Sequence, residues 1–363
     1  MDVLSKVAHK NKLKVLYHEK PFKGVNGSGK HCNWSMSTDS GDNLLDPTVK
    51  PETNYRFLLI LVAVLHAVQN HGGLLRTSIA SASNEHRLGA HEAPPSVVSV
   101  FLGEHLSEFE FRAVGSKQSP AFPVTVLNAA VASALRDVSE ALRTQMAGKP
   151  FATDSDKLAV IKKFIGSTKA VRFEGDGYSE AWLQEAERRG LPNIKSCPEA
   201  FAQLLDPAHA NMMTKLHIFS QSELTSRFLI MNERYAKDLL VEANTMRTLL
   251  AQQILPATFE YRGFLANSAS LLKGIAGEEE SPELATLKAL TPLVKELQGT
   301  ITALDESIAE LHQIHDDPVA EANAAANHIL PAMRAARSAA DRLETLTADK
   351  YYPIPRYSEL LWF

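Results

Sequence analysis

The clearest hydrophobic pattern lies in the last quarter of the chain, where apolar residues recur at alternating spacings of three and four. This period predicts two amphipathic helices. Ser281-Pro282 and Asp317-Pro318 each place a capping side chain before a proline suited to the first helical turn. We therefore expect an antiparallel helical hairpin over residues 276–350, with a coiled-coil-like seam that packs on itself rather than on a partner subunit. The predicted seam residues are Leu287, Leu290, Val294, Leu297, Ile301, Leu304, Ile308 and Leu311, then Ala322, Ala326, Ile329, Met333, Ala336, Ala340 and Leu343.

Helix and strand patterns alternate in the first 75 residues. Residues 2–10 predict a short amphipathic helix with its apolar side chains on one face, and "KLKVLYHEK" alternates apolar and polar residues as a strand does. The segment "PETNYRFLLILVAVLHAVQNH" has the length of a buried helix, which Gly72-Gly73 is predicted to end. A loop is expected to follow, from Arg76 to Val98.

Beyond this loop, one strand is followed by a mainly helical region. "EFEFRAV", residues 108–114, alternates strictly and predicts a strand, and residues 124–147 predict a helix. Residues 168–190 predict a short strand-like piece and a helix ending at Gly190, and residues 222–256 predict one or two long helices. The fold class expected is α+β, with an antiparallel sheet covered by helices and a helical C-terminal region. We predict four segments: residues 1–150, a helical continuation at 151–275, the hairpin at 276–350 and a tail at 351–363.

Composition narrows the classes of protein to which this chain could belong. It has 363 residues, 45% of them hydrophobic, a net charge of -4 and a pI near 6.4. This charge predicts no nucleic-acid partner, and two cysteines build no disulfide framework. The longest apolar run, "FLLILVAVL", is less than half of the ~20 residues that span a bilayer. The first residues lack the apolar core of a signal peptide, so we expect a cytoplasmic protein without a membrane partner.

The segment "GVNGSGKH", residues 24–31, nearly matches the phosphate-binding pattern G-x-x-x-x-G-K-[ST]. That motif needs a helix opening at the lysine and a hydroxyl for the metal. The residues after Lys30 have no helical period, and His31 stands where the hydroxyl should be. A phosphate-loop NTPase is therefore disfavoured, and a strand or loop at Lys30 would dismiss it. A tight glycine turn without a ligand stays open at this point.

Two further segments carry side chains suited to binding. In "EFEFRAV" the alternation puts Phe109, Phe111 and Ala113 on one face and Glu108, Glu110 and Arg112 on the other. Carboxylates bind hard cations and Arg grips carboxylates, although a solvated strand face with local ion pairs is the simpler interpretation. The segment "SNEHRLGAHEAPP" places Arg87 and Glu92 in a predicted loop, where binding residues concentrate.

Taken in this order, the three segments resemble glutamine synthetase. The wording "LYHEKPFKGVNGSGKHCNWSM", "ASNEHRLGAHEAPPSVVSVFLG", "FEFRAVGSKQS" and "GDGYSEAWLQEAERRGLPN" is similar to the type III branch, as is the ending "YYPIPRYSELLWF". The resemblance covers nearly the whole chain. It implies a homo-oligomeric ring of a nitrogen-assimilating enzyme that ligates ammonium to glutamate with ATP, through an acyl phosphate. Magnesium or manganese would be the cofactor.

The resemblance also implies roles for individual residues. His31 and Glu110 would bind one metal ion. Asn26, Gly27, Arg87 and Arg112 would contact glutamate. Glu92 would lie on the flap that closes the site, helping to bind ammonium, and Asn33 and Ser35 would lie along the ATP side. These implied site residues are Asn26, Gly27, His31, Asn33, Ser35, Arg87, Glu92, Glu110 and Arg112.

The sequence departs from the family pattern at two places. The family carries an N-terminal half before the region that matches "MDVLSKVAHK", and a longer insert where only "EHLSE" stands here. We expect such a chain to be the C-terminal part of an enzyme, a gene-model remnant, a chain with residues omitted, or a short paralogue that binds or assembles without catalysing. Phosphoryl transfer depends on all of its charge clamps together, so the non-catalytic alternative stays open.

Overall fold

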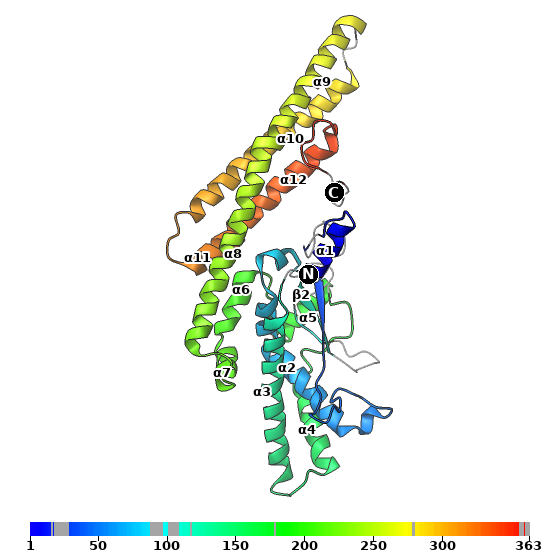
Figure 1. The fold of residues 1–363 in the computed structure, drawn as a ribbon, viewed down its shortest axis with the longest axis vertical. Helices are drawn as coiled ribbons and strands as arrows, with labels where there is room; N and C mark the ends of the chain where they lie inside the picture. The colour runs from blue at the N-terminus through cyan, green and yellow to red at the C-terminus, as the bar shows by residue number, and fades with distance from the viewer. Residues whose placement is uncertain are drawn as a thin grey trace. The chain divides into compact units, whose positions relative to one another are not determined.

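The computed structural model describes residues 1–15, 17, 29–87, 97–100, 109–116, 118–177, 179–277, 280–355 and 359. The chain forms two compact units, Tyr17–Met231 and Met1–Leu16 with Asn232–Phe363 (Figure 1). The first unit contains β1 (Gly29–Trp34), a 3-10 turn (Pro51–Thr53), α2 (Tyr55–Ile79), a 3-10 helix (Ala82–Arg87), β2 (Phe109–Gly115), α3 (Ala121–Met146), α4 (Asp154–Ser167), α5 (Glu180–Arg188), α6 (Cys197–Ala202), a 3-10 turn (Gln203–Leu205), α7 (Pro207–Lys215) and the start of α8 (Gln221–Leu249). The second contains α1 (Asp2–Lys10), the rest of α8, a π turn (Leu250–Ile254), α9 (Leu255–Ala276), α10 (Pro282–Leu311), α11 (Pro318–Ala324), a π turn (Ala325–Ile329) and α12 (Leu330–Leu346).

The fold is α+β, as predicted, with a small antiparallel sheet among many helices. Among the described residues the sheet has two strands, β1 and β2. The helices α2 and α3 pack against each other, and α4 packs against both of them. The side chain of Trp34 at the end of β1 donates from Nε1 to Asn128 Oδ1 of α3, at 2.8 Å. This bond fixes the sheet to the helical core.

The helix α2 runs further than its glycines predict. It begins after Asn54, whose side chain caps Phe57 N–H, and it continues through Gly72-Gly73 to Ile79. The backbone breaks from helical geometry only at His71, where φ is -124°. A Cβ atom at position 73 would collide with the side chain of Gln203. The predicted end was wrong because glycine here serves close packing rather than helix termination.

Two helices, α2 and α3, are long and apolar enough to cross a membrane by length and composition alone. This corrects the expectation that no segment qualifies. Their apolar side chains fill the core of the unit, with Val62, Leu74 and Val126 all fully buried. A core helix passes the same test, so the two helices are weak evidence for a membrane.

The long helical segment after residue 220 also exceeds its prediction. Helix continues from Gln221 through Pro256 to Ala276, whereas the sequence predicted an end near Pro256. A π turn at Leu250–Ile254 lies just before this proline. Proline lacks the N–H that an α-helix interior needs, and π turns occur where the hydrogen-bond ladder adjusts. The chain therefore passes the proline without ending the helix.

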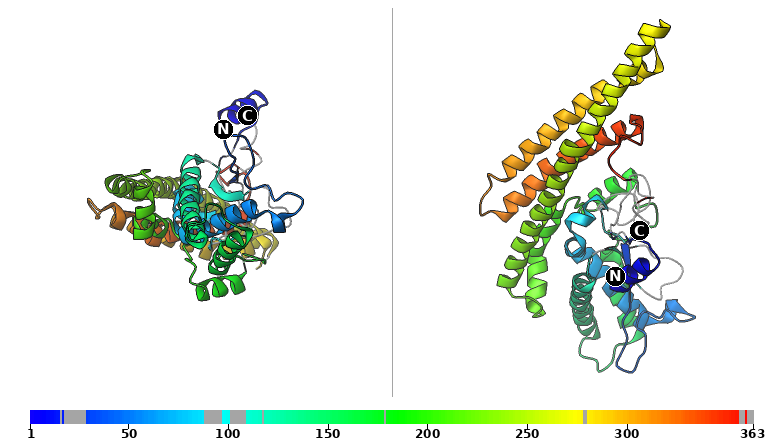
Figure 2. Two further views of the ribbon diagram at one scale, coloured as in Figure 1. Left: turned by 90° about the horizontal axis from the view of Figure 1, so that it is seen from below. Right: turned by 45° about the horizontal axis from the view of Figure 1, so that its top comes forward.

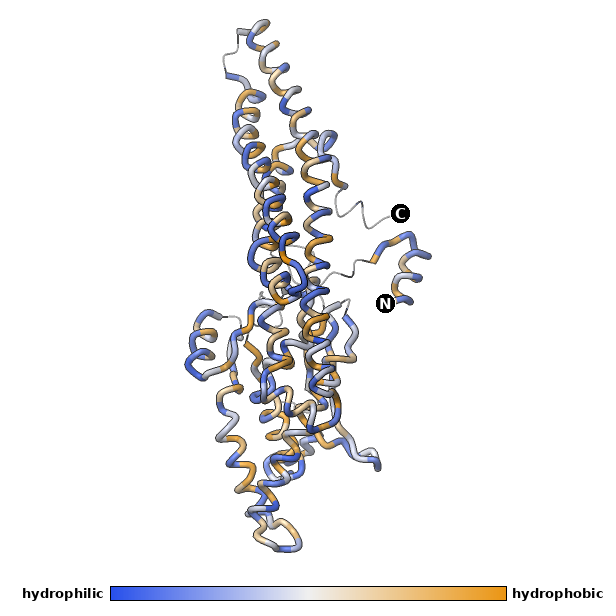
Figure 3. The backbone as a smooth tube through the Cα atoms, turned by 90° about the vertical axis from the view of Figure 1, so that its left-hand side faces the viewer, coloured by the Kyte–Doolittle hydropathy of each residue, from blue (hydrophilic) through white to orange (hydrophobic). Residues whose placement is uncertain are grey.

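The C-terminal region is a bundle of three helical segments rather than a hairpin alone. The helices α10 and α12 pack against each other as an antiparallel pair, and α9 packs against α10 as a third member (Figure 2). Both predicted caps form: Ser281 Oγ accepts from Leu284 N–H, and Asp317 Oδ1 accepts from Val319 and Ala320 N–H. Hydrophobic and hydrophilic residues alternate along these helices (Figure 3), as the spacing of three and four requires.

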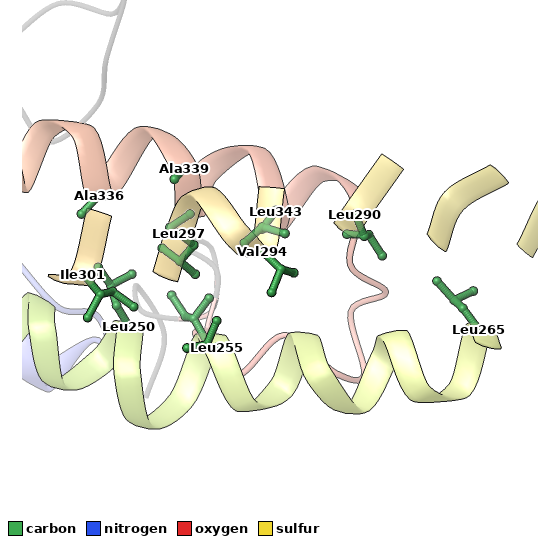
Figure 4. Packing of buried hydrophobic residues seen from close by; sticks show 12 residues of the cluster. Leu250, Leu255, Leu265, Leu290, Val294, Leu297, Ile301, Ala336, Ala339 and Leu343 are labelled. Atoms are coloured by element: carbon green, nitrogen blue, oxygen red, sulfur yellow. The ribbon is translucent and has the colours of Figure 1, made fainter. Parts of the chain in front are cut away.

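The predicted seam forms the core of this bundle. Leu290, Leu297, Leu304 and Leu343 are fully buried, and the close-up shows apolar side chains of three helical segments meeting between them (Figure 4). One position differs, because Ala325 rather than Ala326 is the fully buried alanine. A π turn at Ala325–Ile329 changes the residues per turn there, so the buried face moves by one residue.

The N-terminal helix is confirmed, although its apolar face is exposed. The side chains of Val3, Leu4 and Val7 are 71%, 59% and 51% exposed. Of the predicted strand over "KLKVLYHEK", Leu13 forms a single bridge, Lys14 and Val15 lie outside a strand, and four of the residues that follow lie outside the described part.

Candidate active site

The chain at Lys30 is a strand. The strand β1 covers Gly29–Trp34, so no helix opens at the lysine. A phosphate-loop nucleotide site requires that helix, because its N-terminal N–H groups hold the phosphates. The phosphate-loop alternative is therefore excluded, and "KHCNW" is read as extended chain with alternating faces.

The register between β1 and β2 contains a bulge at His31. Lys30 pairs with Val114 and Cys32 pairs with Phe111, so one residue of β1 lies opposite two of β2. Beyond the bulge, Asn33 pairs directly with Glu110. Bulges often lie beside active sites, where they redirect a side chain. Here the bulge sets which residues share a face with His31.

This bulge corrects the strict alternation predicted for β2. Phe111 and Val114 are both buried, although an odd and an even position would lie on opposite faces of a regular strand. The extra residue shifts the face by one position, and Val114 joins the core. The predicted core position Ala113 and the predicted partner Arg112 lie in the bulge, and their side chains are outside the described part.

The register beyond the bulge brings His31 and Glu110 together. His31 lies two residues before Asn33 on the same face, which makes it the diagonal neighbour of Glu110. His31 Nδ1 and Glu110 Oε1 are 2.6 Å apart, and the two side chains are 50% and 28% exposed. Imidazole and carboxylate therefore meet at a surface that a ligand could reach.

The pair suits two neighbouring ligands of a divalent metal. Ligands at right angles around a magnesium-sized ion, with bonds of ~2.1 Å, are about 3 Å apart, so a small opening of the 2.6 Å contact would fit one. Carboxylate oxygen suits magnesium and manganese, and imidazole suits the softer transition ions. Among the described residues no cluster of three His, Cys, Asp or Glu side chains could hold a metal. Among the described residues, the pair therefore offers two of the several ligands that such an ion would need.

Asn33 and Ser35, the two residues predicted on the ATP side, lie on β1 and just after it. Asn33 is exposed on β1 beside Glu110. Ser35 lies just past the strand, and its hydroxyl donates to Asn43 Oδ1 at 2.9 Å. The same Asn43 oxygen accepts from Leu45 N–H, so Ser35 belongs to a structured turn.

Arg87 ends a short helix whose base is firmly held. The 3-10 helix Ala82–Arg87 contains Asn84 and Glu85, which are 0% and 6% exposed. Asn84 donates to Ile79 O at 2.9 Å, and Glu85 accepts from Cys197 N–H at 3.1 Å. The Arg87 side chain is outside the described part, but its backbone belongs to a 3-10 helix that the bonds of Asn84 and Glu85 hold in place.

The remaining predicted site residues cannot be placed. Asn26, Gly27 and Glu92 lie outside the described residues, as does the side chain of Arg112. The structure therefore brings together His31, Glu110 and Asn33, and it leaves the glutamate contacts and the flap as predictions.

A buried polar layer near Glu85 was not predicted from the sequence. Arg76 is 1% exposed and donates from Nε to Ile194 O, and burial lowers its pKa to about 10 while nearby charges partly offset this. Burial raises the pKa of the Cys197 thiol well above its usual range, and Glu85 adds to this shift. The thiol therefore stays protonated, which argues against a nucleophile or metal ligand there. Arg76 lies in a segment predicted as loop, so its burial could not be predicted from the sequence.

Two family models match this chain. The glutamine synthetase catalytic domain matches residues 2–75, which contain His31, and the glutamine synthetase C-terminal domain matches residues 157–273. Type-3 glutamine synthetase of Dictyostelium discoideum is 35% identical over 414 aligned positions, covering 100% of this chain and 56% of the relative. The chain belongs to the glutamine synthetase family. This confirms the resemblance predicted from the three motifs.

Two further glutamine synthetases show the same coverage. Those of Bacteroides fragilis (strain YCH46) and Butyrivibrio fibrisolvens are each 32% identical over the whole of this chain, and the chain covers 57% and 58% of their length. The chain thus spans a little over half the length of these glutamine synthetases. The alignment with the Dictyostelium protein also has more positions than this chain has residues, so that relative carries internal residues that this one lacks.

A solved structure described as apo GmaS without ligand shares 18% identity with this chain. It covers 52% of this chain and 46% of its own, with a TM-score of 0.31. So partial a superposition supports no conclusion about the site.

Proposed function

We propose that this chain carries the metal and glutamate side of a glutamine synthetase active site, which ligates ammonia to glutamate with ATP. The observation that carries the proposal is the His31–Glu110 pair, at 2.6 Å on the exposed face of the two-stranded sheet. It lies in a chain of the glutamine synthetase family, beside a bulge in the sheet.

In this proposal His31 and Glu110 would hold one Mg²⁺ or Mn²⁺ ion. When bound, the ion supplies positive charge beside the phosphoryl group in transfer. The half-exposed imidazole contributes one ligand and the carboxylate of Glu110 contributes another. Their positions on adjacent strands of one sheet limit how far apart they can move, which favours a preformed site.

The other predicted residues hold the substrates. Asn26 and Gly27 contact glutamate from the loop, and Arg87 and Arg112 pair with its carboxylates. These four residues would orient the side-chain carboxylate for reaction.

Three residues complete the predicted site. Asn33 and Ser35 line the ATP side, where Asn33 is exposed on the same face as His31. Glu92 lies on the flap, helps to bind ammonium and shields the intermediate from water.

The reaction proceeds in two displacements. The glutamate side-chain carboxylate attacks the γ-phosphorus of ATP, which releases ADP and gives an acyl phosphate. Ammonia then attacks the acyl carbon, phosphate leaves, and glutamine is formed after loss of a proton. Positive side chains near both carboxylates stabilise the charge that builds up during transfer.

We further infer a homo-oligomeric ring in the cytoplasm, acting in nitrogen metabolism, as expected for the family. The proposed organisation keeps the catalytic core in residues 1–150, its helical continuation in 151–275, the helical hairpin in 276–350 and the tail in 351–363.

A second candidate is a non-catalytic relative that binds ligands or assembles with full-length subunits. It follows from the dependence of phosphoryl transfer on all of its charge clamps together, of which the described residues place His31 and Glu110. The loss of one charge clamp lowers the value of those that remain.

Glutamine formation by the purified 363-residue protein separates the two candidates. The assay contains glutamate, ammonium, ATP and Mg²⁺ or Mn²⁺, with Glu110→Gln as the matched variant. ATP- and ammonium-dependent product that disappears in the variant supports the enzyme. No product, together with co-assembly with a full-length relative, would establish the second candidate instead.

A further inference from the structure

The strand pair at the candidate site needs an element that holds its register. A slip of one residue between β1 and β2 would move His31 to the opposite face from Glu110. Among the described residues, the bulge divides the ladder into the pairs at Lys30 and Gly29 and the pairs from Cys32 to Trp34. The buried face helps to specify the register, but the bulge interrupts it, and a pair of strands is only marginally stable by itself.

One residue outside the strands contacts both of them and a helix. The Gln118 carbonyl oxygen accepts from Lys30 Nζ on β1. The Gln118 side-chain oxygen accepts from Gly115 N–H at the end of β2, at 3.2 Å. Its side-chain nitrogen donates to Ser78 O in the last turn of α2, at 2.6 Å. Gln118 thus connects β1, β2 and α2.

These three bonds lie on the Lys30 side of the bulge, where Val114 of β2 is buried but β1 has no buried side chain among its described residues. The far end of β1 is fixed by Trp34, which is buried and bonded to Asn128. The near end of β1 holds Lys30, which reaches the Gln118 carbonyl. His31 lies between these two anchors, so both are needed to fix where its imidazole points.

We propose that Gln118 is a positioning residue that sets the register of β1 on β2 and so keeps His31 beside Glu110. The expected effect on metal binding rests on the proposed function, whereas the hydrogen bonds of Gln118 do not depend on it. Loss of the side-chain bonds to Gly115 and Ser78 would release Gln118, and with it the carbonyl that holds Lys30 of β1. The strand β1 could then shift at the bulge, which would lower metal affinity while the helical core stays folded.

The test uses Gln118→Met in the full chain. Methionine keeps the length of the side chain and removes both of its hydrogen bonds. The matched control is Gln69→Met, because Gln69 also donates to a backbone carbonyl, Ser167 O at 2.7 Å, from the same unit but away from the strands. Two readouts are compared: Mn²⁺ affinity by electron paramagnetic resonance, and amide hydrogen exchange of peptides covering Gly29–Trp34 and Phe109–Gly115.

We expect Gln118→Met to weaken Mn²⁺ binding about tenfold and to speed exchange in both strands about tenfold, with helical content unchanged. Gln69→Met should change neither. Wild-type affinity and wild-type strand exchange in Gln118→Met would overturn the role of Gln118. If the wild-type chain binds no Mn²⁺, the proposed function loses its metal site, and strand exchange alone then decides for or against Gln118.

Discussion

The helical bundle and the two-stranded sheet position their contacting residues by different means. In the bundle, α10 and α12 are neighbours in sequence, and each buries the face marked by its own spacing of three and four. In the sheet, Trp34 pairs with Phe109 far along the chain, and a bulge decides which side chains meet. Local periodicity fixes the first arrangement, whereas long-range pairing fixes the second.

Because of this difference, we expect the bundle to determine mainly the stability of the chain and the sheet to determine mainly ligand binding. The bundle has many equivalent buried positions, so each contributes a share of the packing energy. The sheet has one His–carboxylate pair whose distance depends on one register. We therefore expect variants in the bundle to change the free energy of unfolding and variants in the sheet to change ligand binding. Each class of variant should have little effect on the other property.

The largest effect expected on stability is Leu297→Ala in the bundle. Leu297 is fully buried between helices, and a Leu-to-Ala change in such a site costs about 2–5 kcal/mol of unfolding free energy. Leu271→Ala is the matched control, because Leu271 is 55% exposed on α9 and should cost less than about 1 kcal/mol. Urea unfolding followed by circular dichroism measures both. Equal costs would show that the seam is not the core of the bundle.

The largest effect expected on binding is Glu110→Gln. Removing the carboxylate should weaken Mn²⁺ binding at least about a hundredfold, because the ion loses a negatively charged oxygen ligand of the kind that Mn²⁺ prefers. Asp137→Asn is the control: His66 and Asp137 form another His–carboxylate contact, at 3.3 Å, on two helices of the same unit. Titration with Mn²⁺ should give wild-type affinity for this control. A weaker Mn²⁺ affinity in Asp137→Asn than in Glu110→Gln would show that the ion binds at His66 and Asp137 rather than at His31 and Glu110.

The sequence predicted the helices well and the site in part. The seam of α10 and α12 followed from spacing, apart from the shift at Ala325 that a π turn produces. Gly72-Gly73 and Pro256 were misread as helix ends, because tertiary packing and a π turn override these local signals. Local propensity does not contain the neighbours that decide such positions.

The pairing of His31 with Glu110 could be expected only through family resemblance. Alternation alone put Glu110 on a polar face but could not show what lies beside it. The bulge opposite His31 has no signal in "EFEFRAV", since its cause is the partner strand. The roles of Asn26, Gly27, Arg87, Glu92 and Arg112 stay predictions.

A smaller effect is expected at Asp156, in the capping box of α4. Its buried carboxylate accepts from Lys149 Nζ at 3.0 Å and from Thr153 N–H and Oγ. Bonds from Thr153 and Lys149 lower the pKa of Asp156 from 3.8 to about 2. A lowered folded-state pKa stabilises the fold above the unfolded value, and that contribution is lost as pH falls.

Asp156→Asn should therefore be less stable than wild type at neutral pH, and the difference should shrink between pH 4 and pH 2. Thermal unfolding at a series of pH values measures this. The control is Asp154→Asn, an exposed first-turn neighbour paired with Lys157 at 2.9 Å. A difference that stays constant down to pH 2 would contradict a charge-based cause.

The smallest effect expected is Asp317→Ala, at the turn between the paired helices. Asp317 Oδ1 accepts from the N–H groups of Val319 and Ala320, at 3.1 and 3.0 Å, and loss of such a cap costs about 1 kcal/mol. Asp317→Asn keeps an accepting oxygen and should recover most of the loss. Urea unfolding of both variants gives the comparison, and Mn²⁺ affinity should stay at the wild-type value in each. If Asp317→Ala instead weakened Mn²⁺ binding, the bundle and the sheet would be energetically coupled, and the separation of stability from function drawn between them would fail.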